Sequence, residues 1–298
     1  MNNRGDLNTE QQNENSLNID KMEVEEILHA INNEDASIAI AVKTAIPQIK
    51  ETVNHTIFSI KNGGRVFYVG AGTSGRLGVL DASEIPPTFS ASTDNFIGII
   101  SGGDKALRRS IEGAEDNATD AIRDLEGFKL DNKDTLIGIS CSGAAAYVIS
   151  ALDHAREKGA STTYIVTNPQ PHMMTEVDTI IYADTGPEII TGSTRMKAGT
   201  ATKMILNMIS TTTMVKLGKV YGNLMVDLMA VNDKLIDRGT RIIMQVTGLD
   251  YERAKDRLME ADRSVKLALV MQNNECGLED GKKLLKHADG FLNRVLKK

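Results

Sequence analysis

The chain reads Arg65-Val-Phe-Tyr-Val-Gly-Ala-Gly-Thr-Ser-Gly-Arg76, a short apolar run followed by a glycine-rich turn. The apolar run is typical of a β-strand, and Leu77-Gly-Val-Leu80 begins a helical pattern. Glycines let the backbone approach a ligand closely, and the N–H groups of a helix start attract an anion. The turn lacks the lysine of a nucleotide-binding loop and the GxGxxG spacing, so a monophosphate on Gly72, Thr73 and Ser74 is predicted.

Further strands and helices alternate on both sides of this stretch, as expected of an α/β protein. Because the strands are apolar throughout and separated by helices, they predict a parallel sheet covered on both faces. The predicted strands are residues 66–69, 96–100, 135–140, 161–167 and 179–182. The predicted helices are residues 20–32, 34–61 with a kink at Pro47, 114–125, 144–158, 196–216 and 226–238.

Three segments are predicted along the chain. Residues 1–20 are polar and are expected to be flexible, and residues 21–240 form the α/β domain with its N-terminal helices. Residues 241–298 contain short helical patterns at 251–261, 278–285 and 289–296, with a further apolar segment at 242–246. They predict a small helical C-terminal module.

Composition excludes several classes of protein. The 298 residues are 41% hydrophobic and 25% charged, with a net charge of −6 and no basic block, so neither nucleic acid nor an anionic membrane is an expected partner. The two cysteines, Cys141 and Cys276, lie far apart, which predicts neither a disulfide framework nor a metal site. The polar N-terminus is no signal peptide and no apolar run reaches membrane-spanning length, so a cytoplasmic protein is expected.

A second turn repeats the first arrangement. In Ile137-Gly-Ile-Ser-Cys-Ser-Gly143 an apolar strand ends in Ser140 and Ser142, and a helix follows. Ligands of doubly wound sheets bind beyond the carboxyl ends of the strands, so the two turns can hold one phosphate between them. Alternatively, Ser142 only caps the next helix.

A third segment, Gly186-Pro-Glu-Ile-Ile-Thr-Gly-Ser-Thr-Arg-Met-Lys197, precedes the long helix. Its hydroxyl and basic side chains either contact the sugar phosphate or belong to an ordinary capped helix start with solvated cations. The predicted substrate-binding residues here are Ser193, Thr194, Arg195 and Lys197.

Two acidic groups are candidates for catalysis. Glu84 lies directly before Ile85-Pro86-Pro87, where the helix is expected to end, and an acid at a helix C-terminus is electrostatically unfavourable. Glu115 lies in Glu112-Gly-Ala-Glu-Asp116, which can equally be a solvated helix N-terminus.

The quoted segments resemble a known family. The stretch from Gly70 to Phe89, the Glu112–Asp116 cluster and the stretch from Gly186 to Lys203 are similar to the signatures of the bacterial N-acetylmuramic acid 6-phosphate etherases. The resemblance runs from about Thr9 to the C-terminus. It implies a sugar isomerase (SIS) fold with a five-stranded parallel sheet flanked by helices, a small helical C-terminal module, and a homodimer whose active sites use both subunits.

The resemblance also implies a reaction without metal or cofactor. The lactyl ether of N-acetylmuramic acid 6-phosphate is cleaved by elimination and hydration to N-acetylglucosamine 6-phosphate and D-lactate. By position in the motifs, Glu115 is implied as the base at C2, and Glu84 as the acid that protonates the ether oxygen and later activates water.

The sequence departs from the family in the second turn. The usual Arg-Thr-Pro is replaced by Ala144-Ala145-Ala146, and the lost threonine is a phosphate donor in many SIS domains. We therefore hypothesise weaker phosphate binding or a compensating donor. Near the N-terminus, Thr9-Glu-Gln-Gln-Asn13 lacks the arginine that usually precedes the asparagine.

Three other classes of function are alternatives to the etherase. A non-catalytic sugar-phosphate sensor resembling the two-domain glucokinase regulatory protein is supported by the altered second turn, but both glutamates are present. An aldose–ketose isomerase needs no acid for a leaving group, so the Asp81-Ala-Ser-Glu84 sequence is not expected there. A transcription factor would need a helix-turn-helix or a basic surface.

Overall fold

The computed structural model describes residues 5, 7–228 and 230–296, and the chain divides into two compact units. The first unit contains the residues up to Ser83 together with Thr93–Ser210. The second contains Glu84–Ser92 together with the residues from Thr211 onward. Each unit is described by itself.

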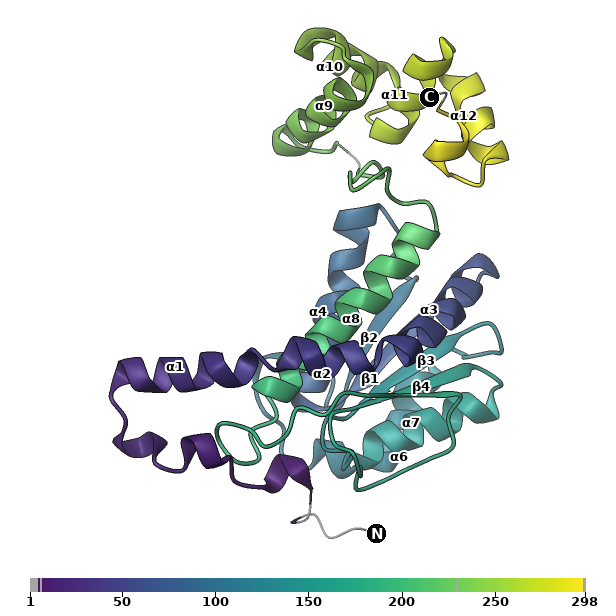
Figure 1. The fold of residues 1–298 in the computed structure, drawn as a ribbon. Coiled ribbons are helices and arrows are strands. Elements are labelled where there is room, and N and C mark those ends of the chain that lie inside the picture. The colour runs from purple at the N-terminus through teal and green to yellow at the C-terminus, as the bar shows by residue number, and fades with distance from the viewer. Residues whose placement is uncertain (1–4, 6, 229, 297–298) are drawn as a thin grey trace. The chain divides into compact units, whose positions relative to one another are not determined.

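The first unit is built on a five-stranded parallel sheet (Figure 1). The strand order is β2-β1-β3-β4-β5, and every residue of β1 and β3 is buried, as an all-apolar strand requires. The predicted parallel sheet is therefore confirmed. The strands are β1 (Val66–Gly70), β2 (Phe96–Ile100), β3 (Thr135–Ile139), β4 (Ser161–Val166) and β5 (Thr179–Tyr182).

Helices cover both faces of this sheet. On one face, α6 (Ala118–Glu126) and α7 (Ala146–Glu157) share a core with Leu136 of β3 and Tyr164 of β4. The neighbouring residues Thr135 and Thr163 point to the opposite face, because side chains alternate along a strand. There they form buried hydrogen bonds with Ser59 (2.7 Å) and Thr52 (3.1 Å) of α3 (Ile46–Lys61).

The strand order determines where a ligand can bind. The chain leaves β1 in one direction to β2, and the remaining strands follow on the other side through β3. In such sheets the loops after the two central strands diverge and leave a crevice between them. The two predicted anion turns follow β1 and β3, so both lie at this point of reversal.

Several predicted helices differ from the structure in their bounds. The expected helix over 34–61 is two helices, because α2 (Ile38–Thr44) ends at Ala45 and Pro47 occupies the first turn of α3, where its missing N–H costs nothing. The expected helix over 114–125 begins only at Ala118, after a single 3₁₀ turn, η5 (Ala114–Asp116). Helices α1 (Val24–Asp35) and α5 (Asp104–Arg108) also belong to the first unit, whereas α8 (Lys197–Lys216) begins there and its residues from Thr211 onward belong to the second unit.

The helix after the first turn was expected to end before Pro86, and this was wrong. Helix α4 (Gly72–Phe89) continues through both prolines. The two prolines remove N–H donors for one turn only, whereas Ile85 and Phe89, four residues apart on one side of the helix, are both buried. Burial of these two side chains outweighs the lost hydrogen bonds.

The N-terminal segment packs on the segment before α8. Its described part contains short 3₁₀ turns, and the Ser16 hydroxyl donates to the Ile189 carbonyl (2.7 Å) while the Gly192 N–H donates to the Thr9 carbonyl (2.9 Å). The flexibility expected of residues 1–20 remains a prediction. The turns are η2 (Asn8–Glu10), η3 (Glu14–Ser16) and η4 (Ile19–Lys21).

The second unit is helical, as predicted. The expected helix over 226–238 begins only at residue 233, where the Asn232 side chain accepts from the Leu235 N–H (2.9 Å), and it runs unbroken through 242–246. Residues 289–296 contain only the short η6 (Leu292–Arg294), and the domain boundary placed at residue 240 remains a prediction. The helices are α9 (Asp233–Thr247), α10 (Tyr251–Glu260), α11 (Val265–Asn274) and α12 (Leu278–His287).

Candidate active site

The turn between β1 and α4 brings backbone and hydroxyl groups to one place. Gly72 has φ of +52°, which only glycine adopts without strain. A Cβ on Gly75 would lie 2.5 Å from the Gly70 carbonyl oxygen, so this glycine lets α4 start directly against β1. Thr73 and Ser74 therefore fall in the first turn of α4, where N–H groups have no partner within the helix.

The turn between β3 and α7 is built in the same way. Gly143 has φ of +70°, and a Cβ there would lie 2.2 Å from Pro171, so the loop can fold only with glycine at this position. Ser140 is buried, and its N–H donates to the Ile165 carbonyl of β4 (3.0 Å). Ala145 is the N-cap of α7 and offers no side-chain acceptor to that helix start.

A cavity of about 120 Å³ lies between the two turns. A water molecule occupies about 30 Å³ in the liquid, so the space suits a group the size of a phosphate. Hydroxyl groups and helix starts dominate its wall, and no lysine or arginine is among its lining residues. The lining residues are Ala71, Gly72, Thr73, Ser74, Glu115, Ile139, Ser140, Cys141, Ser142, Ala145 and Thr194. We call this space the hydroxyl cavity.

Cys141 lies in the wall of the hydroxyl cavity. Its Sγ is 3.5 Å from both the Ser74 and the Thr202 hydroxyl oxygens, so it links the start of α4 to α8. Burial raises the pKa of the Cys141 thiol, and hydrogen bonds from Ser74 and Thr202 oppose this rise only in part. The thiol is thus a structural contact rather than a nucleophile.

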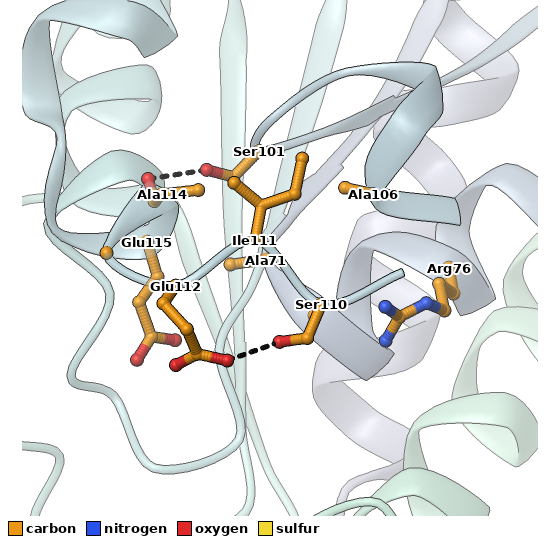
Figure 2. A pocket seen from close by; sticks show the side chains of 11 residues that line it. Ala71, Arg76, Ser101, Ala106, Ser110, Ile111, Glu112, Ala114 and Glu115 are labelled. Carbon is orange, nitrogen blue, oxygen red and sulfur yellow. Dashed lines mark hydrogen bonds between the residues drawn. The ribbon is translucent and has the colours of Figure 1, made fainter. Parts of the chain in front are cut away.

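A second cavity, of about 140 Å³, adjoins the first (Figure 2). The two share Ala71, Gly72 and Glu115 in their walls. The other residues that line the second cavity are Arg76, Ser101, Ala106, Ser110, Ile111, Glu112, Gly113 and Ala114. We call it the Arg76 cavity.

Glu115, the predicted base, is held where the two cavities meet. It lies on η5, which begins after Gly113 in the left-handed conformation. The Ser101 hydroxyl at the end of β2 donates to the Ala114 carbonyl (2.6 Å), as Figure 2 shows, and this bond fixes the turn against the sheet. The neighbouring Glu112 carboxylate accepts from the Ser110 hydroxyl (2.8 Å).

The third predicted segment reaches the hydroxyl cavity only through Thr194. Ser193 and Arg195 do not line it, and Arg195 is exposed. Lys197 is buried, and its Nζ is 2.5 Å from the Glu34 carboxylate and 3.0 Å from the Pro187 carbonyl. Binding of substrate by Ser193, Arg195 and Lys197 remains a prediction, and the Lys197 cation already has two partners.

Glu84, the predicted acid, belongs to the second compact unit. It lies on α4, and its side chain is exposed. The catalytic role of Glu84 remains a prediction.

The sequence alone did not reveal an ion pair beside the first turn, between the buried Asp81 and the half-buried Lys203. Lys203 of α8 lies 2.6 Å from the Asp81 carboxylate of α4, which also accepts from the Tyr68 hydroxyl (3.3 Å). Burial, and then the charge of Asp81, raise the pKa of Tyr68. Both Asp81 and Lys203 lie inside the quoted family segments, which was the available signal.

Among the described residues, no group of three or more His, Cys, Asp or Glu side chains is placed to hold a metal ion. No helix in the described part of the chain is both long and apolar enough to cross a membrane.

The parallel sheet and its two hydroxyl-bearing turns define a domain of the sugar isomerase class. Residues 48–156 match the family model of the glucokinase regulatory protein N-terminal SIS domain, and this range contains both turns and η5.

The chain belongs to the N-acetylmuramic acid 6-phosphate etherase family. It is 47% identical to the etherase of Bacillus cytotoxicus over 97% of this chain and 99% of the relative. It is 49% identical to the etherase of Oceanobacillus iheyensis over 97% of this chain and 98% of that relative. It is also 47% identical to N-acetylmuramic acid 6-phosphate etherase 1 of Bacillus licheniformis, over 98% of this chain and 96% of that relative.

Proposed function

We propose that this protein is a lyase that cleaves the D-lactyl ether of N-acetylmuramic acid 6-phosphate, giving N-acetylglucosamine 6-phosphate and D-lactate. Family membership over nearly the whole chain supports the reaction. The observation that carries the proposal is the hydroxyl cavity with Glu115 in its wall, at the point where the strand order reverses. We further propose that the protein acts in the cytoplasm.

The proposed phosphate site uses neutral donors. Thr73, Ser74, Ser140, Ser142 and Thr194 offer hydroxyl groups, and the first N–H groups of α4 and α7 add backbone donors. Hydrogen bonds to a charged group are stronger than neutral ones, so several such donors hold a phosphate without a lysine.

The proposed chemistry needs a base and an acid. In the open-chain sugar the aldehyde acidifies the C2 proton, and the Glu115 carboxylate removes it. The C3–O bond to lactate breaks as a C2–C3 double bond forms, and Glu84 donates a proton to the departing oxygen. Water then adds at C3 with Glu84 as base and restores a hydroxyl group, while the protonated Glu115 returns its proton to C2, so the net reaction consumes one water.

The proposal is tested by D-lactate release from N-acetylmuramic acid 6-phosphate. Glu115→Gln and Glu84→Gln are each expected to lower kcat by about 10²–10⁴-fold, because each removes one proton-transfer group. Glu126→Gln, an exposed carboxylate on α6 outside both cavities, serves as the control and should retain full activity.

The alternative function is a non-catalytic sugar-phosphate sensor. The alanines at 144–146, one of which lies in the wall of the hydroxyl cavity, are the observation that favours it. Wild-type protein that binds N-acetylmuramic acid 6-phosphate without releasing D-lactate would establish the sensor and refute the lyase.

A further inference from the structure

The Arg76 cavity has no role in phosphate binding as proposed above. It adjoins the hydroxyl cavity, and the two have Ala71, Gly72 and Glu115 in common. A substrate held by its phosphate in the first cavity, with C2 at Glu115, extends its remaining groups toward the second. The lining of the Arg76 cavity therefore decides which substituent of the sugar it accepts.

Its charged groups are arranged on two sides. Arg76 is the one cation among the lining residues, and Glu112 and Glu115 are the acids. Figure 2 shows the Arg76 guanidinium on one side of the cavity and the two carboxylates on the other, with Ser110 between them. A cavity with this charge separation can hold an anion only beside Arg76.

The Arg76 guanidinium has donors available. It is half-buried, and its Nε donates to the Leu107 carbonyl (3.3 Å), which orients the group. Within the described residues its two terminal nitrogens form no hydrogen bond, and no carboxylate forms an ion pair with it. Two parallel N–H groups are the arrangement that binds a carboxylate through both oxygens.

The rest of the wall supplies apolar contact. Buried Ala106 and the side chain of Ile111 lie beside the same space. A ligand group with one carboxylate and one methyl would therefore satisfy both parts of the wall. The N-acetyl group of the substrate has a methyl but no charge, so it leaves the arginine unpaired.

We propose that Arg76 binds the carboxylate of the D-lactyl group and that Ala106 and Ile111 contact its methyl group. The inference rests on the proposed lyase function and names the residue that distinguishes the substrate from its product. The substrate has two anionic ends, and each receives its own cavity: neutral donors hold the phosphate and the arginine holds the lactyl carboxylate. Without Arg76, that carboxylate would face only Glu112 and Glu115 and would be repelled.

The test compares two ligands that differ only in the lactyl group. In Arg76→Met, kcat/KM for N-acetylmuramic acid 6-phosphate is expected to fall about 10- to 100-fold, the range for one lost hydrogen-bonded charge pair. The inhibition constant of N-acetylglucosamine 6-phosphate, which has the phosphate but no lactyl group, should stay within about twofold. Arg109→Met, an exposed arginine outside the cavity, is the control for loss of a positive charge.

Arg76→Lys provides a second variant that keeps the charge but loses the paired donors. It should show a partial loss for the lactyl substrate and none for the product. Equal loss for both ligands in both variants would assign Arg76 to the phosphate or to the fold, and no loss for either would also overturn the proposal. The lyase proposal fails separately, if wild-type protein releases no D-lactate.

Discussion

At residue scale, the most unusual position is Ala145. It is buried in the wall of the hydroxyl cavity and begins α7 without a side-chain cap. A threonine at this position would place a hydroxyl group where it can cap the start of α7 and donate to a phosphate in the hydroxyl cavity. Helix capping and a hydrogen bond to a charged group are both favourable.

We therefore expect Ala145→Thr to lower KM for N-acetylmuramic acid 6-phosphate about tenfold, from a hydrogen bond to the phosphate. A side-chain cap should also raise the free energy of unfolding by about 1 kcal/mol. Ala145→Val is the matched control, because valine has the shape of threonine without its hydroxyl group. Equal KM values for the two variants would show that another donor already compensates for the alanine.

At the scale of elements, one ion pair joins the end of α1 to the start of α8. Glu34 accepts from Lys197, Asn13 and Asn15, and the Lys197 side chain is only 4% exposed. Glu188 is buried and accepts from the N–H groups of Lys197 and Ala198 (both 2.9 Å), which caps α8. The sequence spacing could not reveal the Glu34–Lys197 pair, since the two residues are 163 positions apart.

This pair predicts acid sensitivity. Burial alone would raise the pKa of Glu34, but hydrogen bonds from Lys197, Asn15 and Asn13 outweigh it and hold the pKa below 4.5. Because the folded-state pKa is lowered, the stabilisation by Glu34 is present above pH 4.5 and is lost as the pH falls through the folded-state pKa.

Glu34→Gln leaves the buried Lys197 without a counter-charge, so it should reduce the free energy of unfolding at pH 7 by about 3 kcal/mol. Urea unfolding should show that the difference from wild type shrinks as the pH falls below about 4.5. Glu25→Gln, on the same helix with a side chain 89% exposed, should match wild type throughout. A difference for Glu34→Gln that does not depend on pH would refute the ionic explanation.

The same scale explains which elements could be predicted from the sequence. The five strands were found because they are short runs rich in aliphatic, β-branched and aromatic residues, which is the pattern of a buried parallel sheet. The predicted end of α4 was wrong because burial of side chains outweighed the local signal of Pro86. The predicted start of α9 was wrong because the residues around the buried Val226 are not helical. Helix α11 was missed because its residues 265–271 are buried on all sides and show no helical period.

For the candidate site, the two glycine turns and the acidic cluster Glu112–Asp116 were predictable, because their residues are contiguous in the sequence. The structure brings Thr73, Ser140, Thr194 and Glu115 to one cavity, as the argument from converging strand ends required. Lys197 illustrates the limit: its positive charge just before the long helix suggested a ligand contact, whereas its burial against Glu34 depends on a residue 163 positions away.

At the scale of the whole molecule, we propose a homodimer, supported by apolar side chains on the N-terminal helices. Helix α1 has no buried residue, and Val24 and Leu28, four residues apart, are 73% and 62% exposed. Figure 1 shows α1 beside the sheet domain rather than over the sheet. Ile40 of α2 and Phe58 of α3 are also exposed, and apolar surface of this kind is typical of contacts between chains.

If each active site uses Glu84 from one subunit and Glu115 from the other, two inactive variants can complement one another. In a mixed dimer of Glu84→Gln and Glu115→Gln, one site would then have both glutamates and the other neither. Random exchange makes about half of the dimers mixed, each with one intact site of two, so about a quarter of wild-type D-lactate release should return. Light scattering should give a mass near twice the 32.4 kDa of the chain. No recovery of activity, in a sample shown by mass to contain mixed dimers, would place both glutamates of each site in one subunit.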